Sequence, residues 1–370
     1  MGQPSLGSLH LLAPAHRAGS PEAVADALVA LHATDPASVH LAVAARTAGA
    51  GAPVADVDRA LHVDRSIVRV MGMRRTMWAV PAGLVAVVVA ACGRAVGVAE
   101  RRKLVAMVEA QGLAGDGGRL VAELEERALA ALAARGDASV TELAEDEPEL
   151  RRTIRVGGDS KWAADVNLAS RVVLLLTCDG RVVRSRRRGG WTSMLHSYAV
   201  APPADPIDTA DARRELARRW LAAFGLLSAD PEADLRWWAG WTVAATREAL
   251  AGAERPDPPP AGEPWAALLP GLDSTTMGWK ERSWYLGDLG PLLFDRNGNA
   301  GPAVWWAGRV VGGWTQRPDG EVVTRLLVDV GREGEAAVEA EAERLATWLA
   351  ASGAVVKPRF PTPLLRELAS

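Results

Sequence analysis

The feature that most constrains the fold of this chain is a repeated order of short helices followed by a turn-rich pair of strands. Residues 21–46 contain two runs of apolar residues at helical spacing, residues 56–61 form a third short helix, and two strand-like runs follow at residues 66–70 and 77–80. Three helices followed by a hairpin is the order of a winged-helix unit. We therefore predict a first winged-helix unit, with the helices that follow it, in residues 1–135.

A second unit of the same kind is predicted for residues 136–205. The phrase Ser139–Leu143 is typical of the first helix of a helix-turn-helix and begins with a residue suited to helix capping. Further on, the apolar run 172–176 leads through an Asp-Gly pair into the strand-like residues 181–184. Because Asp-Gly is typical of a tight turn before a returning strand, we interpret this stretch as a second wing.

A third set of helices indicates a third unit in residues 206–262. Its helices are expected at residues 211–224, 231–239 and 242–252, and Pro256 to Pro260 is interpreted as a linker.

The last part of the chain changes from helical to strand-like patterns. Strands are expected at residues 303–306, 309–314 and 322–330, followed by a helix at residues 335–351. We predict a small C-terminal β-barrel with a terminal helix in residues 263–370. The whole chain is thus expected to be an α+β fold of three tandem winged-helix units and a barrel.

Composition limits the kinds of function that fit the chain. Its 370 residues exceed one ordinary domain, and its net charge of −3 means that any nucleic-acid surface must be a local patch. Cys92 and Cys178 are far apart and neither lies in a C-x-x-C spacing, so no metal and no disulfide are expected. No cofactor motif occurs. The apolar stretch 84–92 is too short to span a membrane, so a cytoplasmic protein is expected.

A local basic patch is predicted in the second unit. Residues 181–190 contain five arginines and no acidic residue. A wing with this charge is expected to bind DNA phosphates through Arg184, Arg186, Arg187 and Arg188, with Arg155 and Lys161 alongside. The alternative is a solvated loop.

Three separated passages carry a family resemblance: Leu31–Pro36, Arg74–Pro81, and Leu268–Asp273 together with Phe294–Gly298. They are similar to Gln-x-Gln-Asp-Pro, to Arg-x-Thr with a hydrophobic pair, and to Leu-Leu-Pro-x-x-Asp with an Asp-Arg-Asn-Gly turn. In this order they resemble the AlkZ-like family of tandem winged-helix DNA glycosylases. The resemblance implies a crescent of three winged helices and a β-barrel around DNA, and hydrolysis of the N-glycosidic bond of alkylated purines, including bulky adducts.

The resemblance places His32 and Thr34 at the positions of the two family glutamines, so both catalytic side chains are changed. An N7-alkylated guanine already carries a positive charge and is a good leaving group. Catalysis is therefore needed mainly to activate the attacking water molecule. A neutral imidazole accepts a hydrogen bond from water and takes its proton, which makes His32 our candidate water activator. Thr34 is expected to hold the water, and Asp35 to stabilise oxocarbenium charge. The alternatives are local capping for Thr34 and Asp35, and a structural histidine for His32.

The predicted first wing supplies further candidate DNA contacts. Arg74 and Arg75 are expected near the lesion, while Trp78 or Trp191 either stack on DNA or pack inside the protein. Because flipping a bulky adduct into a tight pocket is costly, an open cleft is expected.

These observations predict a monofunctional glycosylase that uses water, because no lysine lies near the His32 passage in sequence and the chain has only four. Its partner would be double-stranded DNA with an alkylated guanine, and the protein would be a nucleoid-associated monomer. By analogy with the family, the changed catalytic residues suggest protection of a producer from its own DNA-alkylating antibiotic. The alternative is a non-enzymatic winged-helix regulator or damage-binding protein, which would bind without releasing a base.

Overall fold

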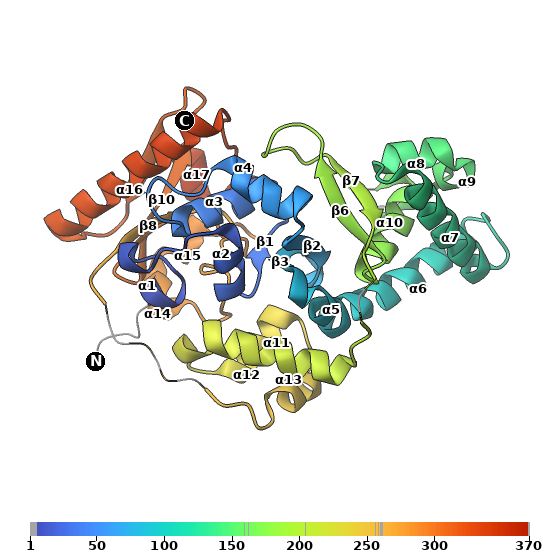
Figure 1. Cartoon of the computed structure of the whole chain (residues 1–370), viewed down its shortest axis with the longest axis horizontal. Coiled ribbons are helices and arrows are strands. Elements are labelled where there is room, and N and C mark those ends of the chain that lie inside the picture. Colours follow the sequence, from blue (N-terminus) through green and yellow to red (C-terminus); the bar gives the residue numbers. More distant parts are fainter. Residues whose placement is uncertain are drawn as a thin grey trace.

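The computed structural model describes residues 6–158, 160–161, 163–203, 205–255, 257, 259 and 262–368. In Figure 1 the N-terminal helices and the C-terminal sheet lie together on one side of the molecule. Helices α6 to α10 and the β6–β7 hairpin form a lobe on the other side, and α11 to α13 lie below the centre (Figure 1). The predicted linker Pro256 to Pro260 falls largely outside the described residues.

The first part of the chain forms the predicted hairpin but joins it to an unpredicted strand. Its elements are α1 (Leu6–Leu9), α2 (Pro21–Ala27), β1 (Leu31–His32), α3 (Pro36–Arg46), α4 (Val54–Asp58), β2 (Ile67–Met71) and β3 (Met77–Pro81). Strands β2 and β3 pair antiparallel, which confirms the hairpin. No strand was predicted between the first two helices, but β1 adds to the free edge of β3 and places His32 opposite Trp78. Two residues are too few to produce a recognisable alternation.

A long helical run connects this part to the second lobe. Helix α5 (Val85–Val88) continues through a π-helical turn (Val89–Gly93) into α6 (Arg94–Ala110), and α7 (Gly117–Arg135) follows. The run Ala82–Ala110 is long and apolar enough to cross a membrane by length and composition, and half of the most apolar window is buried inside the protein. This is weak grounds for a membrane span, because a core helix passes the same test. Val88 and Ala91 are indeed part of the main hydrophobic core.

The second lobe differs from the prediction in where its strands lie. Its elements are α8 (Val140–Asp146), α9 (Pro148–Arg151), β4 (Thr153–Val156), β5 (Ala164–Asn167), α10 (Leu168–Cys178), β6 (Val182–Arg187) and β7 (His196–Val200). Ser139 and Glu142 form a capping box at the start of α8, as expected. The apolar run 172–176 is helical rather than a strand of the wing, and β6 pairs with β7 instead. Asp179-Gly180 ends helix α10, because a glycine at positive φ terminates a helix as readily as it makes a hairpin turn.

The third set of helices agrees closely with the prediction. It consists of α11 (Thr209–Ala223), α12 (Pro231–Ala239) and α13 (Val243–Leu250). Side-chain caps from Asp208, Asp230 and Thr242 begin the three helices, which explains why their boundaries could be read from the sequence.

The C-terminal part contains an open sheet, which corrects the prediction of a barrel. Strands β8 (Ala266–Leu269), β9 (Ala303–Trp306), β10 (Arg309–Gln316) and β11 (Val322–Leu326) pair in the order β11-β10-β9-β8. Helices α14 (Ser283–Leu286), α15 (Gly290–Leu293), α16 (Gly331–Ser352) and α17 (Pro363–Leu368) accompany them. In the described residues the edge strands β8 and β11 do not meet. Helix α16 packs against both edge strands. The helix therefore shields from water a part of the sheet that would lie inside a closed barrel.

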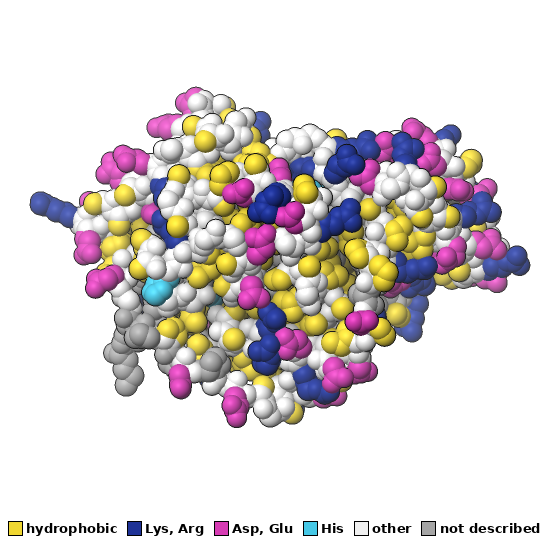
Figure 2. Space-filling view, in the orientation of Figure 1, with side chains coloured by type: hydrophobic (Ala, Val, Ile, Leu, Met, Phe, Trp, Pro, Cys, Tyr) yellow, Lys and Arg dark blue, Asp and Glu magenta, His cyan; other side chains and the backbone are white. Residues whose placement is uncertain are grey.

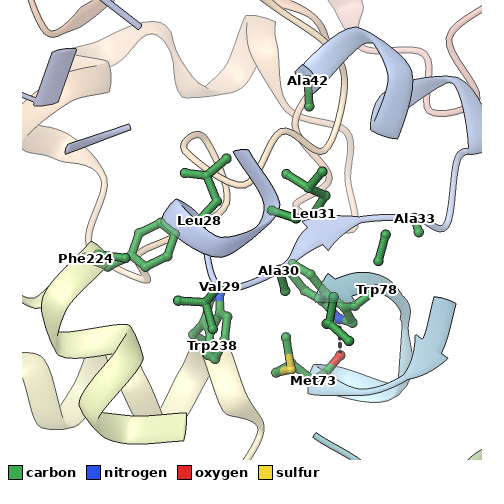
Figure 3. Packing of buried hydrophobic residues seen from close by; sticks show 14 of the residues in the cluster. Leu28, Val29, Ala30, Leu31, Ala33, Ala42, Met73, Trp78, Phe224 and Trp238 are labelled. Carbon is green, nitrogen blue, oxygen red and sulfur yellow. Dashed lines mark hydrogen bonds between the residues drawn. The ribbon is translucent and has the colours of Figure 1, made fainter. Parts of the chain in front are cut away.

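One hydrophobic core joins segments that are far apart in the sequence. Leu28, Leu31 and Trp78 of the N-terminal part pack with Phe224 and Trp238 of the third set of helices. Figure 3 shows these side chains around β1, and the Trp78 indole donates a hydrogen bond to the carbonyl of Met73 at 3.1 Å. Because this core lies directly behind β1, it fixes the position of His32.

Candidate functional site

The three passages that carry the family resemblance meet at one cavity of about 340 Å³. His32 comes from the first passage, Arg74 and Thr76 from the second, and Asn297 and Gly298 from the turn of the third. Segments that the resemblance did not mark complete its lining, with Trp237, Met277, Lys280, Arg282 and Asn299. The cavity is therefore the candidate active site.

His32 lies at the wall of this cavity with only 5% of its surface exposed. Its ring packs against Trp78 with 4.6 Å between ring centroids, and its Nδ1 accepts a hydrogen bond from the backbone N–H of Thr34 at 3.5 Å. Burial, together with the charge of Arg74, lowers the pKa of His32 to about 3. The ring is therefore neutral at physiological pH. Because Nδ1 accepts a hydrogen bond, the proton of the neutral ring is on Nε2. The ring can therefore orient a water molecule by a hydrogen bond, and its low pKa makes it a weak base.

Two arginines lie against the same tryptophan ring in the lining of the cavity. The guanidinium of Arg74 lies 4.0 Å from the ring centroid of Trp237, and that of Arg282 lies 4.9 Å from the same ring. Burial and the charge of Arg282 lower the pKa of Arg74 to about 10. Arg74 also has a positive φ of 52°, a conformation that non-glycine residues adopt only where the surrounding structure holds it. These contacts hold the Arg74 charge at the cavity.

Lys280 shares the cavity with His32, which the sequence analysis missed. The side chain of Asp234, 2% exposed, accepts hydrogen bonds from the backbone N–H groups of Lys280 at 2.9 Å and Glu281 at 3.1 Å. This anchors the backbone of the lysine. Lys280 lies far from His32 in the sequence, so the spacing of residues did not indicate that the two are close. No lysine lies near the His32 passage in the sequence, but the fold brings Lys280 into the same cavity as His32.

The cavity has an excess of positive charge. Arg74, Lys280 and Arg282 line it, His32 is neutral, and none of the described residues in the lining carries a carboxylate. Such a site suits an anionic group, such as a backbone phosphate, and repels a cationic one.

The turn of the third passage is held by its own aspartate. Asp295 accepts hydrogen bonds from the backbone N–H groups of Asn297 at 2.8 Å and Asn299 at 2.9 Å. Gly298 adopts a φ of 78°, which a glycine permits without strain. The turn therefore presents the asparagines to the cavity as polar, uncharged groups.

The other half of this passage is structural. Arg46 and Asp273, both fully buried, form a bidentate ion pair with distances of 2.9 and 2.7 Å. The pair ties helix α3 to the segment that follows β8. It therefore supports the cavity without lining it.

Thr34 and Asp35 do not line the cavity. The hydroxyl of Thr34 is buried and has no hydrogen-bond partner among the described residues. The carboxylate of Asp35 accepts a hydrogen bond from the backbone N–H of Ala37 at 3.1 Å. Burial raises the pKa of Asp35, and the hydrogen bond from Ala37 opposes this rise. The capping alternative for Asp35 is thus confirmed.

Most of the predicted DNA-contacting arginines already pair with carboxylates. Arg75 pairs with Glu100, Arg155 with Asp165, Arg186 with Asp137 and Arg188 with Glu142. Figure 2 shows basic and acidic side chains interspersed over the visible face. The basic stretch of residues 181–190 contains no acid of its own, but acids distant in sequence fold against it. Lys161 is exposed, whereas the side chain of Arg187 is only 4% exposed.

The two tryptophans considered as DNA contacts are packing residues. Trp78 is fully buried, and Trp191 is 5% exposed between His40 and Trp348. Another cavity, of about 830 Å³, is mainly apolar and is lined by none of the predicted site residues. Within the described part of the chain no group of three or more His, Cys, Asp or Glu residues is placed to hold a metal ion.

The fold and the sequence together define the class of this protein. Its fold is similar to that of the Streptomyces sahachiroi DNA glycosylase AlkZ, with a TM-score of 0.66 and 20% sequence identity over 95% of this chain and 96% of that chain. The family model for AlkZ-like DNA glycosylases matches residues 25–348. No curated protein matches the chain.

The chain therefore belongs to the AlkZ-like DNA glycosylase family. This confirms the resemblance of the three passages.

Proposed function

We propose that this DNA glycosylase hydrolyses the N-glycosidic bond of N7-alkylated guanine in double-stranded DNA, including bulky adducts of genotoxic natural products. The observation that carries the proposal is the meeting of all three family passages at the His32 cavity. Three tandem winged-helix units, curved as a crescent around the duplex, would present this cavity to one strand.

The reaction needs little acid catalysis. The oxygen of a water molecule attacks C1′, the bond from C1′ to N9 breaks, and its electron pair neutralises the cationic base. The water loses its proton to solvent, and an abasic site remains. The neutral ring of His32 orients the water by a hydrogen bond, a role that a carboxamide also performs.

The charge of the cavity supports an open mode of recognition. Arg74, Lys280 and Arg282 attract the phosphates that flank the lesion. The same charges repel a cationic base, so we expect the adduct to stay outside the cavity while its sugar enters. This arrangement avoids flipping a bulky group.

A specialised biological role follows from the changed catalytic residues. His32 and Thr34 stand where the family resemblance places glutamines, and we propose that the protein protects a producer from its own DNA-alkylating antibiotic. It would act as a monomer on nucleoid DNA in the cytoplasm.

A damage-binding protein without catalysis is the second candidate. The low pKa of His32 and the inaccessible hydroxyl of Thr34 favour it, because neither group is a strong base toward water. Such a protein would hold the lesion and release nothing.

The experiment that separates the two candidates measures free base directly. Purified protein is incubated with duplexes that carry N7-methylguanine or a bulky N7-guanine adduct, and the released base is quantified by mass spectrometry while binding is measured by anisotropy. A glycosylase releases the base and leaves alkali-labile sites. Tight lesion binding without any released base would select the binding protein.

A further inference from the structure

A second cavity, of about 230 Å³, shares the tip of the β2–β3 hairpin with the His32 cavity. Arg74 and Thr76 of the tip line the His32 cavity, whereas Met71 and Met77 line the second one. Thr76 and Met77 are consecutive residues in extended conformation, and such residues point to opposite faces. The two cavities therefore lie on opposite sides of the hairpin tip.

The second cavity contains two arginines without partners. Arg171 of α10 and Arg184 of β6 both line it, and the Nε atom of each is buried without a hydrogen-bond partner. Among the described residues, neither forms an ion pair, and no carboxylate belongs to the lining. This differs from Arg186 and Arg188 of the same hairpin, which both pair with acids.

The surroundings do not supply the missing negative charge. Arg69 is 3% exposed, and within the described part of the chain its side chain has a single hydrogen bond, to Nε2 of His62 at 3.3 Å. Both ring nitrogens of His196 are buried without partners, and burial with the charges of Arg184 and Arg69 lowers its pKa to about 3. Asp58, the acid whose charge acts on Arg69, already accepts a hydrogen bond from His40 at 2.9 Å.

Arg171 and Arg184 are both half-buried, and the Nε atom of each is withdrawn from water. A cavity with two such charges and no acid in its described lining attracts an anion. We propose that the cavity of Arg171 and Arg184 binds one backbone phosphodiester of the DNA strand that crosses the hairpin tip. Met71 and Met77 would contact the adjoining sugar, while the sugar of the damaged nucleotide lies at His32 on the other side of the tip. The inference rests on the DNA-binding part of the proposed function.

The test measures binding to undamaged duplex DNA. Its result is therefore independent of whether the protein releases a damaged base. Binding by the wild type, Arg171→Met and Arg184→Met is measured over a range of salt concentrations. Loss of one phosphate contact lowers the slope of log K against log salt by about 0.9. Each Met variant should show this decrease, and Arg184→Lys should keep the wild-type slope. Arg119→Met, which removes an exposed arginine paired with Glu123 in the same lobe, is the matched control and should keep it as well.

A second readout separates a binding site from a structural one. Without DNA, the Met variants should melt at about the same temperature as the wild type, because each arginine is half-buried and forms no ion pair with another described residue. Wild-type salt slopes in both Met variants would overturn the proposal. A second outcome would also overturn it. If inorganic phosphate raised the melting temperature of the wild type but not of the Met variants, while the salt slope of DNA binding was the same in all of them, the cavity would bind a small anion and not DNA.

Discussion

At the scale of single residues, the chemistry of the site depends on a histidine that is neutral because it is buried. His32 packs on Trp78 and faces a cavity with three cationic side chains. The sequence located this residue through the resemblance, but its protonation state depends on Arg74 and on burial, neither of which a linear pattern shows. The same limit applies to Lys280, whose backbone is anchored by the buried Asp234 of helix α12.

The lysine in the cavity provides a direct test of how the abasic product forms. We expect Lys280 to act as an ammonium that holds a phosphate, and water to remain the nucleophile. Incubation of the wild type with damaged duplex and borohydride should therefore yield no covalent complex, whereas an amine nucleophile would be trapped as a reduced imine. Trapping that disappears in Lys280→Ala but persists in Lys357→Ala would show that the enzyme is bifunctional.

At the scale of elements, helices with side-chain caps were the most predictable part of the fold. Helices α11, α12 and α13 begin close to where the sequence placed them, because Asp208, Asp230 and Thr242 mark their first turns. The apolar run 172–176 was misassigned, since a short buried run fits a strand and a helix equally well. Strand β1 was missed because its hydrogen bonds come from β3, a long-range partner.

The buried pair that joins helix α3 to the segment after β8 gives a prediction at this scale. Asp273→Ala leaves the guanidinium of Arg46 buried without its partner. Such changes cost about 3–5 kcal/mol, so we expect a loss of this size in the free energy of unfolding measured with urea. Glu321→Ala, which breaks an exposed pair with Arg317, should cost less than about 1 kcal/mol. Equal effects of the two substitutions would contradict the structural role of Asp273.

At the scale of the whole molecule, the family was predictable and the architecture only partly so. Three short passages identified an AlkZ-like glycosylase because they occur in a specific order along the chain. Strand alternation predicted the C-terminal sheet but not its open edges, because alternation reports which face is buried and not whether the sheet closes. Charge pairing across the fold was equally hidden from composition.

The buried histidines give the molecule a predictable response to acid. Burial lowers the pKa of His10 and of His62 to about 4, and of His32 and His196 to about 3, from a usual value of 6.5. The unfolded chain therefore binds more protons than the fold between these values. Stability should be full above pH 6.5 and fall as the pH decreases below it, by up to about 1.4 kcal/mol per pH unit for each histidine. Urea unfolding at a series of pH values measures this, and a constant stability from pH 7 to pH 5 would contradict it.

The most direct test of the account is the single-turnover rate of base release from an N7-methylguanine duplex by the wild type and three variants. We predict that His32→Ala lowers the rate by roughly 100-fold, that His32→Gln keeps most of it, and that the exposed His16→Ala changes nothing. The wild-type rate should be flat from about pH 6 to pH 8, because the ring stays neutral there. Full activity in His32→Ala, or a rate that falls with acid near pH 6.5, would contradict a neutral histidine that orients the water.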